Sequence, residues 1–142
     1  MKLAATYSRV LQLSRASVLL YWEFLGNDYS LNDGTQPYPA LRLLAQLVEA
    51  FPEDTRVLHT AVNTPGLYAV AGEAPSHTVL HVVNLSPDPR TVWIVGLPVG
   101  VYEHVVSTED VIGRLAGTVR VGEETILLDL APMSVHMLMA RR

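Results

Sequence analysis

Apolar residues recur with two different periods along this chain, and the period changes near residue 52. Residues 3–14 and residues 39–51 place apolar side chains three, four and seven positions apart, which predicts two amphipathic helices. Pro39 and Pro52 bracket the second helix, since proline starts a helix readily and cannot continue one. The first third of the chain is therefore expected to be largely helical.

Between the two expected helices lies the run SVLLYWEF, residues 17–24. Its continuous apolar character, without alternation, is typical of a strand buried on both faces, as in a parallel sheet. Such a strand needs sheet neighbours for its backbone groups. It can join the sheet formed by the rest of the chain, pair with another chain, or belong to the end of a larger α/β protein. The third explanation fits the pattern best.

After Pro52 the chain consists of short β-rich runs separated by turn signals. The runs are TRVLHTAV, LYAVAGEA, HTVLHVVNL, TVWIVGL, VYEHVVST, GTVRVG, ETILLDL and SVHMLMA. About eight short strands at this spacing predict an antiparallel β-sandwich. The fold class expected is α+β, mainly β, with a helix–strand–helix unit at residues 1–52 and the sandwich at residues 53–142.

Composition narrows the functional classes. With 49% hydrophobic and 17% charged residues, the 142-residue chain can bury a core, and its apolar excess suggests a face that meets a partner. A net charge of −4 argues against nucleic-acid binding. No cysteine is present, and no signal peptide or membrane span is visible. We therefore expect a soluble, cytoplasmic protein by default, or an exported one if a leader lies upstream.

Several motifs together give the chain a family likeness. The strand ending in YWEF, the polar loop GNDYSLNDG, the helix PALRLLAQLVEAF and the closing LLDLAPMSVHMLMAR resemble the C-terminal region of a retaining (β/α)8-barrel glycoside hydrolase. Residues 17–24 resemble its eighth barrel strand. The spacing of Leu130, Pro132, Ser134 and Val135 resembles its last sandwich strand.

The resemblance implies a sugar subsite at the end of this strand. Trp22 would form the floor, because the C–H face of a pyranose stacks on an electron-rich ring. Glu23, Asn27 and Asp28 would contact sugar hydroxyls from the loop that follows. The resemblance also implies a cis peptide bond between Trp22 and Glu23. From the residues alone, Trp22 can equally be a core or interface side chain, which is the preferred interpretation for the isolated chain.

Catalysis is not expected from this chain by itself. Retaining hydrolysis uses two carboxyl groups about 5 Å apart, and in the family these come from the fourth and seventh barrel strands, which the sequence lacks. Whether the chain is an enzyme is thus left open. The alternatives are a carbohydrate-binding sandwich module, or a structural protein whose residues 17–24 complete the sheet of a partner. The expected partners are carbohydrate and either a barrel segment or a second copy covering residues 1–52.

Other candidate sites are interpreted more simply. Trp93 can be a carbohydrate platform, but a core position is preferred, and the histidines are expected to be hydrogen-bonded or exposed. The loop around Asp28 and Asn32-Asp33-Gly34 departs from a calcium-loop pattern. The sequon at Asn84 is interpreted as a turn. No cofactor or metal ion is expected.

Overall fold

The computed structural model describes residues 1–13, 35–36, 38–123 and 125–142. This part of the chain forms two helices and eight strands. Their bounds are α1 Lys2–Leu13, α2 Pro39–Ala50, β1 Arg56–Leu58, β2 Leu67–Ala74, β3 His77–Asn84, β4 Arg90–Val95, β5 Gly100–Ser107, β6 Arg114–Val121, β7 Thr125–Leu130 and β8 Ser134–Arg141. No helix among them is long and apolar enough to cross a membrane.

The described strands form two sheets. Six of them make one sheet in the order β1-β2-β3-β8-β5-β6, and β4 pairs with β7 in a separate ribbon. The pairings are antiparallel, so Val82 of β3 lies opposite Ala69 of β2 on one side and His136 of β8 on the other. The last strand in sequence is therefore an inner strand of the larger sheet.

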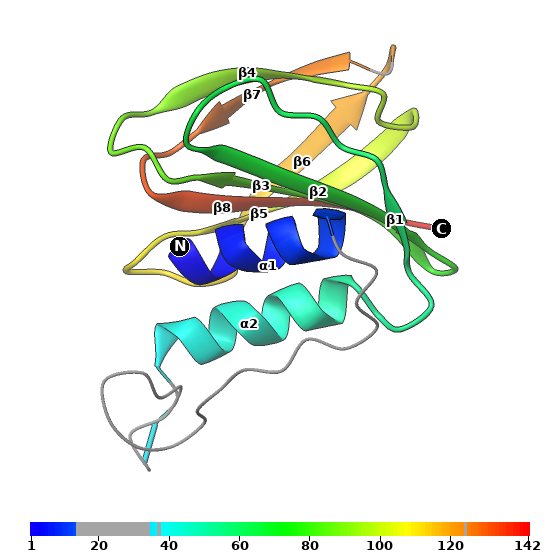
Figure 1. Ribbon diagram of the computed structural model, residues 1–142. Coiled ribbons are helices and arrows are strands. Elements are labelled where there is room, and N and C mark those ends of the chain that lie inside the picture. Colours follow the sequence, from blue (N-terminus) through cyan, green and yellow to red (C-terminus); the bar gives the residue numbers. More distant parts are fainter. Residues whose placement is uncertain (14–34, 37, 124) are drawn as a thin grey trace.

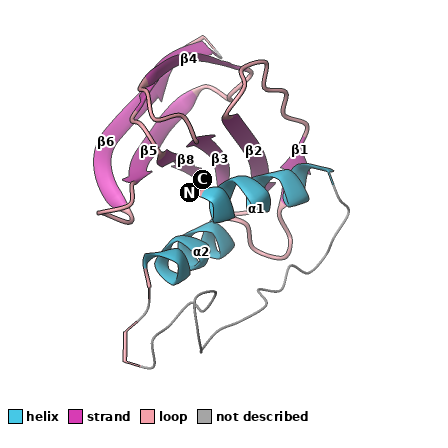
Figure 2. Ribbon diagram, turned by 60° about the vertical axis from the view of Figure 1, so that its left-hand side comes forward, coloured by secondary structure: helices cyan, strands magenta, loops and turns pink. Residues whose placement is uncertain are grey.

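The molecule has three layers (Figure 1). The β4–β7 ribbon covers one face of the six-stranded sheet, and α1 and α2 lie on the opposite face, as the turned view in Figure 2 also shows. Because both faces of β3 are covered, all eight of its residues are buried. This explains why the run HTVLHVVN is apolar with no clear alternation.

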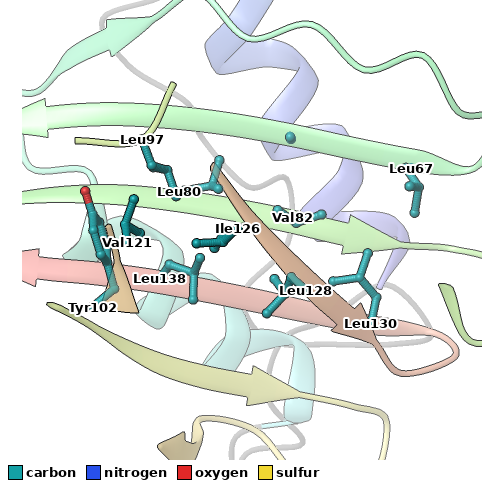
Figure 3. Packing of buried hydrophobic residues seen from close by; sticks show 11 residues of the cluster. Leu67, Leu80, Val82, Leu97, Tyr102, Val121, Ile126, Leu128, Leu130 and Leu138 are labelled. Carbon is teal, nitrogen blue, oxygen red and sulfur yellow. The ribbon is translucent and has the colours of Figure 1, made fainter. Parts of the chain in front are cut away.

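The core between the two sheets is built from alternate residues of each strand. Leu80 and Val82 of β3 and Leu138 of β8 point toward the ribbon, where Ile126 and Leu128 of β7 meet them (Figure 3). Burial of large aliphatic side chains is worth about 1.5–3 kcal/mol each, which makes this cluster a main source of stability.

The second core lies between the sheet and the helices. Ala4 and Ala5 of α1 are buried, and their small side chains let the helix lie close to Val83 and Val135. Leu43 and Leu47 present the buried face of α2, one helical turn apart. The two helices are thus integral to the packing of the sheet.

The predicted fold class is confirmed. Both helices form within one residue of their expected bounds, and each of the eight β-rich runs overlaps a strand, although β6 begins three residues before its run. The expected alternation in the sixth run is also present, with Val121 buried and Arg120 exposed. The prediction is poorest for β1. Only three residues of the run TRVLHTAV, Arg56–Leu58, pair with β2.

Gly72 of β2 marks the tightest contact between the sheet and the segment after α2. A methyl group at this position would lie 2.6 Å from Thr55 Cγ2 and 2.7 Å from Phe51 Cε1. The ring of Phe51 is buried against the sheet beside Val70 and Val79, so it has little room to retreat. Because Gly72 has no side chain, the segment that carries Phe51 and Thr55 can pack closely on the sheet.

We expect Gly72→Ala to lower the free energy of unfolding by about 1–3 kcal/mol, because the added methyl overfills the packed site. Urea unfolding measures the change. The matched control is Gly122→Ala, since a methyl there meets nothing within 4 Å, and its effect should stay within about 0.5 kcal/mol. Equal unfolding midpoints for both variants would contradict the expectation.

Candidate functional site

The site predicted from the resemblance falls outside the described residues. Trp22, Glu23, Asn27 and Asp28 all lie within residues 14–34, and so do the expected strand at residues 17–24 and the peptide bond after Trp22. These assignments therefore remain predictions.

The structure corrects the interpretation of Trp93. Its side chain is 71% exposed, so the preferred core position was wrong. The reason is the alternation of β4, whose Val92 and Ile94 turn inward to the core while Trp93 turns outward. An apolar strand with one covered face must leave alternate residues on the surface.

A groove with a volume of about 440 Å³ lies beside Trp93. Its apolar lining comes from the inner face of the large sheet, including Ala69, Leu80 and Val82. Residues 91–98 of β4 and the following turn line it, and so does the loop 58–64 after β1. We call this hollow the Trp93 groove. Its size lies within the usual range for small-ligand sites.

Hydrogen bonds fix the loop side of the Trp93 groove. Thr60 is held at both ends: its hydroxyl accepts from the Ala71 N–H at 3.3 Å, and the Gln12 amide of α1 donates to its carbonyl oxygen. The same hydroxyl donates to the Leu58 carbonyl at 3.2 Å. The loop is thus tied to the sheet and to a helix, which makes this wall a preformed one.

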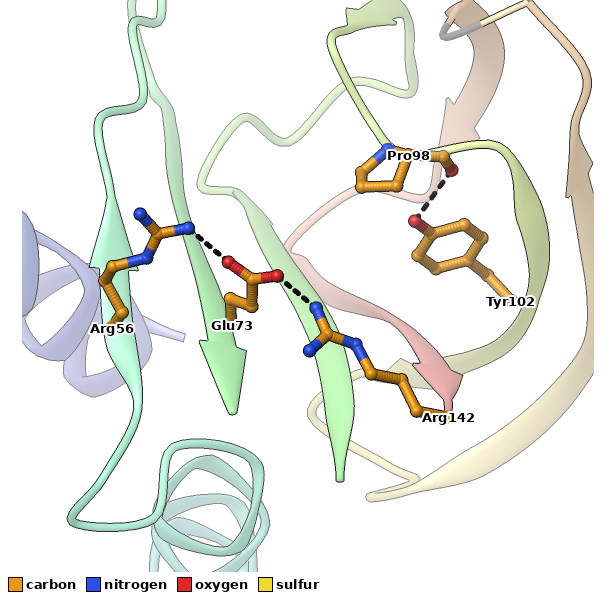
Figure 4. A network of polar contacts seen from close by, with 5 residues as sticks. All are labelled: Arg56, Glu73, Pro98, Tyr102 and Arg142. Atoms are coloured by element: carbon orange, nitrogen blue, oxygen red, sulfur yellow. Dashed lines mark hydrogen bonds and ion pairs between the residues drawn. The ribbon is translucent and has the colours of Figure 1, made fainter. Parts of the chain in front are cut away.

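The other end of the Trp93 groove is fixed by Tyr102. Its hydroxyl donates to the Pro98 carbonyl at 2.9 Å, and its ring is buried in the core below (Figure 4). Burial raises the pKa of the Tyr102 hydroxyl, so it stays a donor at neutral pH. The turn that carries Leu97 and Pro98 into the groove is therefore held by a buried side chain.

A buried polar cluster closes one end of the sandwich. The Asn84 side-chain amide donates to the carbonyls of Asp88 and Ala131 at 3.1 and 2.9 Å and accepts from the Ser86 N–H at 2.9 Å. Ser134 also donates to the Ala131 carbonyl, at 2.6 Å. With its amide fully used and its side chain buried, Asn84 has a structural role in a turn, which confirms the interpretation of the sequon.

His104 and His136 form a pair that the sequence analysis did not bring together. His136 Nε2 accepts from the Ala131 N–H at 3.2 Å, which assigns the proton to Nδ1, and Nδ1 then donates to His104 Nε2 at 2.9 Å. Burial, followed by the neighbouring His104, lowers the pKa of His136 to about 4. Burial also lowers the pKa of His104. The pair is therefore neutral and structural at pH 7.

Glu73 is the acceptor of a small ion-pair network at the sheet edge. Arg56 of β1 and Arg142 after β8 both pair with its carboxylate (Figure 4). Hydrogen bonds from Arg56 and then Arg142 lower the pKa of the Glu73 carboxyl. An ionised, doubly paired carboxylate is suited to joining strands and unsuited to donating a proton.

Of the remaining histidines, His77 has a structural role and His59 lies on the surface. His77 Nε2 donates to the carbonyl of Ala50, the last residue of α2, at 2.9 Å, and Ser76 donates to its Nδ1 at 2.9 Å. His59 is exposed in the loop of the Trp93 groove. No group of three or more His, Cys, Asp or Glu side chains in the described ranges is placed to hold a metal ion.

His81 is the exception to the expectation that the histidines are hydrogen-bonded or exposed. Its ring is fully buried and neither nitrogen has a hydrogen-bond partner among the described residues. The ring packs edge-on against Phe51, with centroids 5.1 Å apart. Burial lowers its pKa from 6.5 to about 3, because an apolar site disfavours the charged ring.

This histidine makes stability depend on pH. Above pH 6.5 neither the folded nor the unfolded chain protonates His81, whereas between pH 6.5 and 3 only the unfolded chain does. Acid therefore favours unfolding. We expect His81→Leu to reduce the slope of unfolding free energy against pH by up to about 1.4 kcal/mol per pH unit in this window. Urea titrations between pH 4 and 7 measure it.

His59→Gln is the control for this measurement, because its ring is already exposed in the folded chain, and it should keep the wild-type slope. A wild-type slope in His81→Leu would contradict the expectation. His136 contributes to acid sensitivity in the same direction, so the difference between variants isolates His81.

Comparison with solved structures places the whole arrangement in a known fold. The structure is similar to a glycoside hydrolase family 30 subfamily 8 xylanase from Clostridium acetobutylicum, with a TM-score of 0.87 and 16% identity over 99% of this chain and 38% of that one. A GH30 endoxylanase from Clostridium papyrosolvens C71 gives a TM-score of 0.83 with 10% identity, over 99% and 37% of the two chains. The catalytic domain of GH30 xylanase C from Talaromyces cellulolyticus gives 0.77 with 16% identity, over 97% and 34%.

These similarities confirm the predicted likeness to a glycoside hydrolase at the level of the fold. The chain spans little more than a third of the length of the solved structures it matches. The sequence matches no protein-family model and no curated protein.

Proposed function

We propose that the chain is the C-terminal portion of a glycoside hydrolase-like protein and is not catalytic by itself. In this proposal residues 1–52 complete a (β/α)8 barrel, and residues 53–142 form a sandwich that supports its last helices. The observation that carries the proposal is the similarity to the Clostridium acetobutylicum xylanase over 99% of the chain, at a TM-score of 0.87. That likeness includes α1 and α2 together with the sandwich, whereas a simple binding sandwich needs no helical layer.

The outer side of the helical layer supports the same proposal. Leu13 at the end of α1, Tyr38 before α2 and Val48 within α2 are exposed apolar side chains. In α2, Val48 stands opposite the buried face formed by Leu43 and Leu47. An exposed apolar side on a helix is typical of a surface that meets another part of a protein. A barrel segment is the partner that the similar solved structures favour.

Within such a barrel, Trp22 would lie under the sugar ring, and Glu23, Asn27 and Asp28 would contact its hydroxyls, as the family resemblance implies. The acid/base and the nucleophile would come from the barrel segment. Because both carboxyl groups are needed for retaining hydrolysis, the isolated chain has only the binding half of the site.

The isolated chain is expected to release no reducing sugar from xylan above the buffer blank, since the acid pair is absent. The assay is run over a range of pH, with Glu23→Gln beside the wild type. Hydrolysis that Glu23→Gln abolishes would overturn the non-catalytic assignment, because it would make Glu23 a catalytic group in this chain.

Association with a barrel provides the second test. The DNA upstream of the Met1 codon is sequenced, and the segment that it encodes is co-expressed with this chain. We expect a complex that hydrolyses xylan, and Val48→Lys should weaken it by about tenfold, the effect of one unfavourable burial of charge. Leu115→Lys on β6 is the control, because Leu115 is equally apolar and exposed but lies on the far edge strand. An upstream frame without barrel strands would overturn the proposal.

A further inference from the structure

Strand β4 has one paired edge and one open edge. Its residues, Arg90–Val95, pair with β7, and no second strand in the described part of the chain pairs with them. In an antiparallel pair, alternate residues direct their N–H and C=O groups toward the partner strand and the others direct theirs away from it. Every second residue of β4 therefore presents its backbone groups to the open edge, and such an edge readily accepts another strand.

The Trp93 groove follows this open edge. Residues 91–98 line it consecutively, so the outward Trp93 takes part as well as the inward Val92. A wall that both sets of side chains share is the edge of a strand, because either face alone would contribute only alternate residues. The loop 58–64 forms the facing wall. The hollow therefore lies where a strand next to β4 would lie.

The floor of the Trp93 groove is the apolar inner face of the large sheet. Ala69 and Ala71 of β2 lie there beside Leu80 and Val82 of β3. The ribbon has two strands and the sheet below it has six (Figure 1). At the usual spacing the strand axes span about 5 Å in the ribbon and about 24 Å in the sheet. The ribbon alone thus leaves part of this face without a covering strand.

An extended peptide fits the edge, the floor and the outer side of the groove together. Its backbone would bond to the open edge of β4, and its inward side chains would pack on Ala69 and Leu80. Its outward side chains would lie beside Trp93, whose ring is now 71% exposed, as a cross-strand pair. A small apolar molecule would fill the floor but would leave the backbone groups of β4 unpaired. The groove therefore favours a strand as its occupant.

The rest of the proposed whole protein is the favoured source of this strand. The chain spans little more than a third of the length of the similar solved structures. A strand of the same polypeptide also has a high effective concentration at the groove. A second copy is a poorer occupant: its own β4 is fixed to its own sheet through Val92 and Ile94, so it cannot also pack on this floor.

We infer that the Trp93 groove is the binding site of a further β-strand, which pairs with β4 and has apolar side chains at alternate positions. The strand comes from the part of the glycoside hydrolase-like protein that lies outside this chain, and this source rests on the proposed function. The site itself rests on the open edge of β4, the hollow along it and the apolar floor. With the strand bound, the ribbon has three strands.

Hydrogen exchange of the β4 amides tests the inference. The chain is expressed alone and with the segment encoded upstream of Met1, and exchange in residues 90–95 is followed by mass spectrometry. In the chain alone, every second amide of β4 should exchange fast. In the complex, these amides should exchange at least about tenfold more slowly, because they become hydrogen-bonded. The comparison needs no substitution, so it does not depend on the folding of a variant.

Ala71→Glu is the variant that tests the floor. Ala71 is half-buried beneath the groove and lies on β2, so a carboxylate there opposes an apolar strand without changing β4. We expect it to weaken the complex by about tenfold, the effect of one unfavourable burial of charge. The matched control is Ala116→Glu, an exposed alanine of β6 given the same charge, and it should leave the complex unchanged. Thermal melting checks that both variants fold.

Three outcomes would overturn the inference. The first is a complex that Val48→Lys weakens but in which β4 still exchanges fast, and it would leave the proposed function intact. The second is slow exchange of every β4 amide in the isolated monomer, since the edge would then be covered within this chain. The third is slow exchange of β4 only in a dimer of the isolated chain, detected by light scattering, which would assign the edge to a second copy.

The proposed function can fail separately from the strand site. An upstream segment that has no barrel strands, yet slows β4 exchange, would contradict the proposed barrel and would support the strand site. The two measurements read different surfaces, because Val48 lies on the helical layer and β4 lies on the opposite face of the sheet (Figure 2).

Discussion

Strand β3 has to be covered on both faces, and the other layers are arranged around that requirement. Its residues alternate between the ribbon side, where Leu80 and Val82 lie, and the helix side, where Val79 and Val83 lie. Without α1 and α2, the second set would be exposed to water at a cost of about 25 cal/mol for each Å² of apolar surface. The helices are therefore part of the core, and their solvent-facing sides carry the exposed Leu13 and Val48.

Much of this architecture could be predicted from the sequence because the apolar periods change with the structure. The two helices and the positions of the strands follow from periods of 3.6 and 2 and from the turn residues between them. The order of the strands could not be obtained this way, since nothing local in SVHMLMA specifies insertion between β3 and β5. The burial of His81 was missed for a related reason: its environment is formed by Phe51 and other residues distant in sequence.

The candidate site was less predictable than the fold. The residues implied by the family resemblance lie between residues 14 and 34, outside the described part of the chain, so their roles are still predictions. Trp93 was misplaced because TVWIVGL is apolar at nearly every position, and apolarity alone does not distinguish the inner face from the outer one. The useful signal was in its partner strand, where Thr125 and Asp129 mark the solvent side of TILLDL.

The position of β8 has a consequence for the way the protein is made. It is synthesised after the other seven described strands, yet it joins β3 on one side to β5 on the other. Until β8 is synthesised, the six-stranded sheet can form only as two separate parts, β1-β2-β3 and β5-β6. The edges of β3 and β5 that β8 later joins are then unpaired. Co-translational folding of this sheet must therefore wait until β8 has been synthesised. A premature stop codon in place of Ser134 would leave 133 of these 142 residues, yet it would remove β8 and with it the join between β3 and β5.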